Sequence, residues 1–202
     1  NRFHKELNSF QVRCMDYYIS NLTDADAKTT ESNLEKVVLQ LRRSRNHIKA
    51  APVYKGDNDL RQGYLAGLDS LLSIFENDFA KVHHLKRYKD LSYKQLLAYQ
   101  DALERAEANV QKTEAKLYSL EFSFAQAYSL SLEHNSLRDE QYKEYQAVSR
   151  HYGLLSRHFI LVDQLVEHCI TPPEEYQNQN LDTFDLGARL SALTNQVDLS
   201  LE

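Results

Sequence analysis

The sequence predicts an all-α protein with an antiparallel four-helix bundle core and an additional C-terminal pair of helices. Two observations lead to this prediction. The 202 residues contain only five glycines and three prolines, so few positions favour a turn. Apolar residues also recur at alternating steps of three and four over most of the chain, which is the spacing of an amphipathic helix. We expect residues 1–134 to form the bundle, and residues 135–202 to form a helical hairpin that packs on it or extends it.

Three amphipathic helices are predicted first, over residues 3–22, about 24–50 and about 58–88. Thr23 or Asp24 can cap the second helix, and Asp57 or Asn58 the third. The third also carries Gly63 and Gly67 four residues apart, which predicts the close approach of a neighbouring helix or a large aromatic side chain that fills the gap. The predicted apolar faces are, in chain order, Phe3, Leu7, Phe10, Cys14 and Tyr17; Leu34, Val37, Val38, Leu41 and Ile48; and Leu65, Leu68, Leu72, Phe75, Phe79 and Val82.

The longest predicted helix covers residues 92–131, which contain neither glycine nor proline. Ser92 and Gln95 form a capping box at its start. Two seven-residue series, offset by three, mark a coiled-coil-like seam. A helix of roughly 60 Å with one apolar stripe needs neighbouring helices, and we expect its inward face to carry no acid or histidine. The series are Leu96, Leu103, Val110, Leu117 and Phe124, and Tyr99, Ala106, Thr113, Leu120 and Ala127.

A second strict seam follows in the next predicted helix, which ends at the sequence Thr171-Pro172-Pro173-Glu174. This seam can be covered within the chain or by a second copy of it. A last helix is predicted from about Asp182, with Phe184, Leu190, Leu193 and Val197 on its apolar face. The residues of the second seam are Tyr145, Val148, Tyr152, Leu155, Phe159, Val162, Val166 and Cys169.

No catalytic, cofactor-binding or metal-binding constellation is predicted. No Glu or Asp is followed by a His three residues later, and no two His stand three or four apart on a helix, so the helical metal-ligand patterns are missing. His151 and His158 are weak metal candidates, since they flank the second seam and could share an ion with an acid from a neighbour.

An acidic row formed by Glu107, Glu114 and Glu121 could in principle act as paired carboxylates or bind a cation. Lys112 and Lys116 are interleaved with it. These alternating charges favour a solvated, ion-paired helix face.

Net charge, apolar run length and the two cysteines limit the possible partners and locations. The net charge of −5 argues against a nucleic-acid partner, and no apolar run approaches the length of a transmembrane helix. Cys14 and Cys169 fall on apolar stripes and are expected to be buried thiols, with a disulfide as the less favoured alternative.

The run A-P-V-Y-K-G-D-N-D-L-R at residues 51–61 lies between two of the predicted helices. It resembles a family of bacterial cell-surface proteins and lipoproteins, found in spirochaetes and Bacteroidetes-like bacteria, that are built as helical bundles with a similar Pro-aromatic-Lys-Gly-Asp turn. The resemblance covers about residues 1–131. It implies a four-helix core and an envelope location, periplasmic or at the surface, with a possible lipid anchor upstream of this chain. It implies no catalytic residue.

We therefore expect a non-enzymatic helical-bundle protein of the bacterial cell envelope that acts through protein contacts or self-association. Two alternatives remain at this point. One is an enzyme, or a metal or ligand carrier, with a site inside the bundle. The other is an intracellular, coiled-coil-like adaptor in the cytoplasm.

Overall fold

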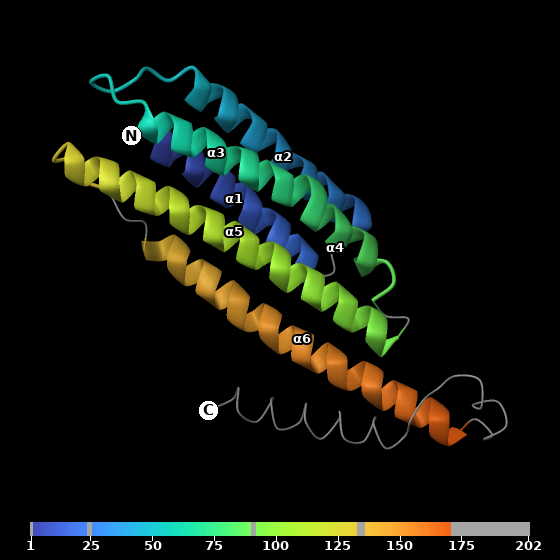
Figure 1. The fold of residues 1–202 in the computed structure, drawn as a ribbon. Helices are drawn as coiled ribbons and strands as arrows, with labels where there is room; N and C mark the ends of the chain where they lie inside the picture. Colours follow the sequence, from blue (N-terminus) through green and yellow to red (C-terminus); the bar gives the residue numbers. More distant parts are fainter. Residues whose placement is uncertain (1, 24–25, 90–91, 133–135, 171–202) are drawn as a thin grey trace. The chain divides into compact units, whose positions relative to one another are not determined.

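The computed structural model describes residues 2–23, 26–89, 92–132 and 136–170, and the described residues are helical without a β-strand. The all-α prediction is therefore confirmed. The predicted helix from Asp182 and the stop at residues 171–174 lie outside the described residues. The elements are α1 (Arg2–Leu22), α2 (Ala27–Lys49), α3 (Asp59–Ser73), the π-helical η1 (Ile74–Asp78), α4 (Phe79–Lys86), α5 (Tyr93–Ala127) and α6 (Ser136–Ile170) (Figure 1).

The chain divides into two compact units. The first consists of Asn1–His84 and Asp101–Tyr142, and the second of Leu85–Gln100 and Lys143–Glu202. The first two turns of α5 therefore group with α6 from Lys143 onward, while the rest of α5 and the start of α6 group with α1, α2 and α3. A bundle over residues 1–134 and a hairpin over residues 135–202 stay predictions.

The core of the first unit is aromatic. The rings of Phe75 and Phe79 are stacked, with centroids 4.6 Å apart, in and just after the π-helical turn η1. Phe10 and Tyr17 of α1 meet these two rings edge-on, at 5.7 Å and 5.3 Å respectively. Each fully buried ring contributes roughly 1.5–3 kcal/mol of hydrophobic free energy. The predicted apolar face of α1 is thus confirmed for Leu7, Phe10, Cys14 and Tyr17, which are all buried, whereas Phe3 is half-buried.

The third predicted helix is present as α3, η1 and α4 in succession, but its buried face is turned relative to the prediction. Tyr64 and Leu71 are fully buried, whereas Leu65 and Leu72, which were predicted to face the core, are half-buried. Leu68, Phe75, Phe79 and Val82 are buried as predicted. The π-helical turn explains part of the difference, because it changes the residue spacing between the two halves of this helix.

Helix starts are set by short polar contacts. The N-cap of α2 is Asp26, whose carboxylate accepts a hydrogen bond from the Thr29 amide at 2.9 Å, rather than Thr23 or Asp24 as predicted. At α3 the N-cap is Asn58, and Asp57 Oδ1 accepts from the Asp59 amide at 2.8 Å. At the start of α5 the first half of the predicted capping box is present, with the backbone amide of Gln95 donating to Ser92 Oγ at 3.3 Å, and Ser92 Oγ in turn donates to Gln95 Oε1 at 3.2 Å.

Close approach between α3 and α5 occurs at the two glycines, as the sequence predicts. A Cβ atom added at Gly67 would lie 2.5 Å from Leu117 Cδ2, and one at Gly63 would collide with Leu120. Aliphatic side chains of α5, rather than an aromatic ring, therefore fill the space that the glycines leave.

A pair of matched substitutions tests this packing. Gly67→Ala is expected to lower the free energy of unfolding by about 1–2 kcal/mol, because Leu117 is buried and has to move. Gly153→Ala, also inside a helix, meets only Gln100 Nε2 at 3.4 Å and is expected to raise stability by about 0.5–1 kcal/mol through helix propensity. Urea unfolding followed by circular dichroism measures both. Equal shifts of the same sign would contradict the close approach.

Candidate functional site

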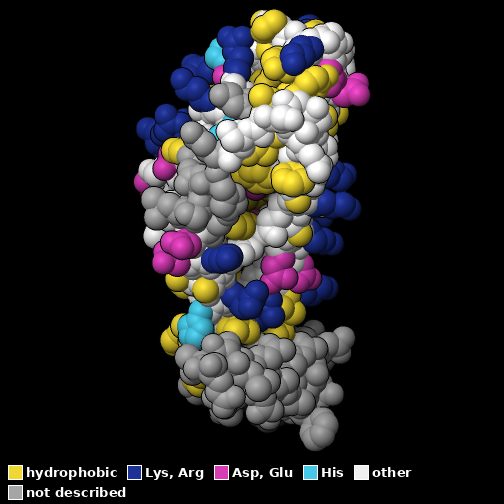
Figure 2. Space-filling model, turned by 90° about the vertical axis from the view of Figure 1, so that its left-hand side faces the viewer, with side chains coloured by type: hydrophobic (Ala, Val, Ile, Leu, Met, Phe, Trp, Pro, Cys, Tyr) yellow, Lys and Arg dark blue, Asp and Glu magenta, His cyan; other side chains and the backbone are white. Residues whose placement is uncertain are grey.

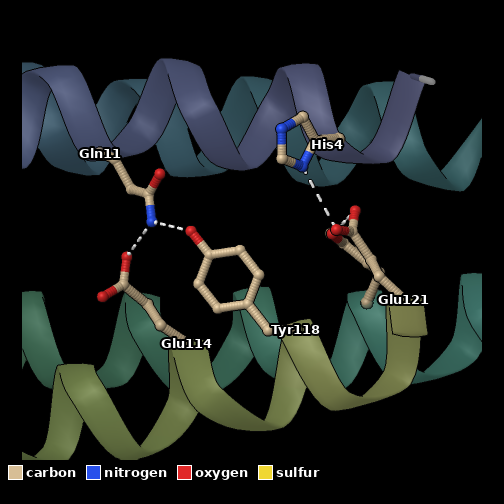
Figure 3. A network of polar contacts seen from close by, with 6 residues as sticks. His4, Gln11, Glu114, Tyr118 and Glu121 are labelled. Carbon is tan, nitrogen blue, oxygen red and sulfur yellow. Dashed lines mark hydrogen bonds and ion pairs between the residues drawn. The ribbon is translucent and has the colours of Figure 1, made fainter. Parts of the chain in front are cut away.

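A column of polar side chains lies between α1 and α5 (Figure 3). Each step of seven residues along α1 is matched by a step of seven in the opposite direction along α5, so the two helices keep one antiparallel register. We call this set the α1–α5 polar column. Its hydrogen-bonded pairs are His4 with Glu121 and Gln11 with Glu114, and Tyr18 and Glu107 stand one further step of seven along the two helices.

The column is most buried at Glu121, whose side chain is only 3% exposed. The hydroxyl of Tyr64 on α3 donates a hydrogen bond to Glu121 Oε1, and His4 Nδ1 lies 3.3 Å from Glu121 Oε2. Burial, followed by the charge and hydrogen bond of Glu121, raises the pKa of Tyr64 far above its usual range. A neutral phenol therefore donates to this carboxyl group, and three helices meet at one acidic side chain.

The next pair is held by an amide. Gln11 Nε2 donates to Glu114 Oε1 at 2.9 Å and to the Tyr118 hydroxyl at 2.7 Å. Figure 3 shows the two contacts meeting at the side-chain nitrogen of Gln11, while Glu114 and Tyr118 stand one turn apart on α5. Gln11 thus bridges two side chains of α5 and fixes its own position opposite Glu114.

The far end of the column contains a thiol and two phenols. Burial raises the pKa of Cys14 well above its ordinary value, with smaller contributions from Glu114 and Glu107. Burial is also the main cause of the raised pKa values of Tyr18 and Tyr142. Cys14 is a free, buried thiol, as predicted. Because a nucleophilic cysteine needs its thiolate form, Cys14 has the properties of a structural residue.

The expectation of a solvated acidic row is wrong for Glu121, and Glu114 and Glu107 are half-buried. The expectation that the inward face of α5 carries no acid is wrong for the same reason. The prediction considered charges only along α5 itself. The signal that could have corrected it lies on α1, where polar residues at positions 4, 11 and 18 repeat with the same seven-residue spacing.

The second strict seam lies on α6 and is largely exposed. We call six of its residues the α6 apolar seam, and their exposed fractions run from 42% to 74%, with Phe159 the most exposed. Tyr145, at its start, is buried instead. At three- and four-residue steps the seam extends over roughly 27 Å of helix. The six residues are Val148, Tyr152, Leu155, Phe159, Val162 and Val166.

A different face of α6 makes the contacts within the second unit. Gln100 Nε2 donates to the Gly153 carbonyl at 3.0 Å, and Arg157 Nε donates to Gln100 Oε1. Leu161 is fully buried. Exposed apolar patches of several hundred Å² on soluble proteins usually mark interaction sites, so the α6 apolar seam is the candidate functional surface.

The two histidines considered as metal ligands lie on α6 and are half-buried. His158 Nδ1 is 3.0 Å from the Leu154 carbonyl oxygen of its own helix. In the part of the chain that the structure describes, no three His, Cys, Asp or Glu side chains form a group that could hold a metal ion. The side chain of Cys169 lies outside the described set.

The turn that carries the family resemblance is tightly built. The Asp57 amide donates to the Tyr54 carbonyl at 2.9 Å, and Lys55 and Gly56 both have positive φ, at 50° and 84°. Two positive φ values in succession characterise a type I′ turn. Lys55 Nζ lies over the rings of Tyr54 and Tyr128, 5.5 Å and 5.7 Å from their centroids. The face of the molecule drawn in Figure 2 shows hydrophobic side chains gathered in its upper part, with Lys and Arg side chains beside them.

Comparison with known proteins gives no match to a family model, to a curated protein or to a solved structure. None of the helices in the described residues is long and apolar enough to cross a membrane. Function is therefore inferred from the geometry of the chain itself.

Removing the carboxyl group of Glu121 tests the structural role of the α1–α5 polar column. Glu121→Ala is expected to lower the free energy of unfolding by about 2–4 kcal/mol, because it leaves a cavity and removes the acceptor of the Tyr64 hydroxyl. Glu76→Ala is the matched control. It breaks an exposed ion pair with Arg42 of 2.7 Å and is expected to change stability by less than about 0.5 kcal/mol. Chemical denaturation measures both, and similar losses would contradict the role of Glu121.

The raised pKa values predict a loss of stability in alkali. Cys14, Tyr18, Tyr64 and Tyr142 each hold their proton to higher pH in the folded than in the unfolded chain. Their stabilisation is complete below the unfolded pKa values, about 8.5 for Cys and about 10 for Tyr, and falls as the pH rises above them. Urea unfolding between pH 7 and 11 should show this fall, by up to about 1.4 kcal/mol per pH unit for each group. Tyr64→Phe should make the fall of stability with pH shallower. An unchanged slope would contradict the raised pKa of Tyr64.

Proposed function

We propose that this protein is a non-enzymatic helical protein that acts by binding another protein chain through the α6 apolar seam. The single observation behind the proposal is that six large apolar side chains of one helix are 42–74% exposed in heptad spacing. Heptad seams bury their side chains against a second helix. The partner surface is therefore an amphipathic helix.

The fold proposed for the first unit is an antiparallel four-helix bundle formed by α1, α2, the α3–α4 stretch and the later part of α5. Contacts between neighbouring helices support it. Ser44 of α2 donates to Glu6 of α1 at 2.7 Å, and Arg45 of α2 pairs with Asp69 of α3 at 2.5 Å. The close approach of α3 to α5 and the α1–α5 polar column supply the other two neighbours.

A location in the bacterial cell envelope is part of the same proposal. It is supported by the run Pro-Val-Tyr-Lys-Gly-Asp at residues 52–57, which resembles the turn of the envelope-protein family and is closed by the 2.9 Å hydrogen bond of Asp57 to Tyr54. Tyr128 adds a hydrogen bond to Asp57 Oδ2 at 3.0 Å. The turn is thus joined by a hydrogen bond to the residue that directly follows α5.

Photo-crosslinking in the cells that make the protein tests the surface. A photoreactive phenylalanine analogue at position 159 is expected to give an adduct of discrete mass, because Phe159 lies in the α6 apolar seam. The same analogue at position 122 is the matched control, since Phe122 is 63% exposed but belongs to α5. Envelope fractions are expected to contain the adduct.

Adducts at both positions with equal yield, or none at position 159, would overturn the proposed contact surface. Recovery of the protein only in the soluble cytoplasmic fraction would overturn the proposed location and leave the surface untouched.

A further inference from the structure

We infer that the helix bound by the α6 apolar seam is the same seam of a second copy of this chain, packed antiparallel about a two-fold axis near residue 157. The inference rests on the proposed function, because it names the partner of that surface. A two-fold axis makes the same patch serve both chains, so no second type of surface is required.

The residue sizes along the seam favour this antiparallel arrangement. The six seam residues lie at equal distances in sequence on either side of residue 157. In an antiparallel pair each of them therefore faces an apolar seam residue of the second copy. Phe159 would face Leu155 of the second copy, and Tyr152 would face its Val162. The outermost layers pair Val148 with Val166. Each aromatic ring therefore meets an aliphatic side chain, which keeps the volume of the four central layers even, and only the two outermost layers contain a pair of valines.

Parallel pairing in register distributes the same side chains less evenly. It places Phe159 against Phe159 and Tyr152 against Tyr152, while Val148, Val162 and Val166 each meet a second valine. The two layers that contain two rings each then lie on either side of a leucine pair, and the three remaining layers contain only two valines each. Interiors are packed close to crystalline density and tolerate such uneven layers poorly.

The residues beside the seam also favour a second copy over a different protein. Helical partners are usually selected by Lys, Arg and Glu side chains that flank the apolar positions. The flanks of this stretch are instead Ser149, Ser156 and Asp163 on one side and His151 and His158 on the other. Asp163 would face Ser149 of the second copy. Self-pairing therefore places no two carboxylates together, and the flanks contain no charge pattern for a partner of opposite sign.

The extent of the seam is sufficient for a weak dimer. Side-chain exposures of 42–74% over about five helical turns amount to an apolar surface on the order of 500–600 Å² per chain. Two such surfaces lie near the lower limit of specific interfaces, which bury about 1,200 Å² or more in total. We expect a concentration-dependent equilibrium between monomer and dimer rather than a permanent dimer.

Cysteine crosslinking of the purified full chain tests both the partner and the direction of packing. Ser156 lies beside the two-fold axis, so Ser156→Cys is expected to form a disulfide-linked dimer on mild oxidation. Ser149→Cys is the matched control, because its two copies would be separated by roughly 20 Å along the antiparallel helices. The parent protein shows any crosslinking by Cys14 and Cys169. Sedimentation equilibrium of the parent over a hundredfold concentration range measures the dimer directly.

A charge placed in the seam gives a second, independent test. Val162→Glu is expected to shift the monomer–dimer equilibrium to monomer by at least tenfold, with an unchanged helical circular dichroism spectrum. His158→Lys, which sets two like charges beside the axis, is expected to weaken the dimer more than His151→Lys, which does not.

Three outcomes would overturn the inference. Equal crosslinking at positions 149 and 156 would exclude the antiparallel register. A parent that stays monomeric while position 159 still gives adducts in cells would assign the surface to another protein, and the proposed function would stand. A monomer without such adducts, in which residues 171–202 protect α6 from hydrogen exchange, would show that the chain covers its own seam, and both proposals would fall.

Discussion

The structure of the first unit depends on how one buried carboxyl group is satisfied. Glu121 lies on the inward side of α5 and has Tyr64 of α3 and His4 of α1 as its polar neighbours. A carboxyl group in such a place is costly unless it is hydrogen-bonded. Sliding α5 by even one turn relative to α1 would separate Glu121 from His4 and Glu114 from Gln11 together. The polar contacts thus specify a register that apolar contacts alone would leave open.

The same register positions α5 against α3. Gly63 directly precedes Tyr64. The side chain of Leu120, the residue next to Glu121, occupies the space that a side chain at Gly63 would fill. One turn further along, Leu117 packs against Gly67 in the same way. The helices can therefore approach closely enough for the Tyr64 hydroxyl to reach the carboxyl group. Small residues and the buried acid act together: the glycines determine the distance between α3 and α5, and the hydrogen bond fixes their alignment.

Much of this could be predicted from the sequence, because apolar periodicity depends mainly on each helix alone. The helices, the capping box at Ser92, the apolar face of α1 and the close approach at Gly63 and Gly67 all follow from local patterns. The inward position of Glu121 does not, because it depends on what a different helix presents to it. The turned face of α3 was also missed, since the π-helical turn at Ile74–Asp78 gives no signal in residue spacing. The sequence contains the seam on α6, but whether it is covered depends on three-dimensional packing.

The two faces of α6 give the strongest physical reason to look for function at its surface. Within its own unit α6 contacts Gln100 through Gly153 and Arg157, while its regular heptad seam stays exposed. Burying a large apolar side chain contributes about 1.5–3 kcal/mol, so a helix that needed only to stabilise its own unit would turn the seam inward. Because the seam is exposed instead, the single chain lacks much of the free energy that burying these side chains would contribute. Association with another helix is the process that would recover it.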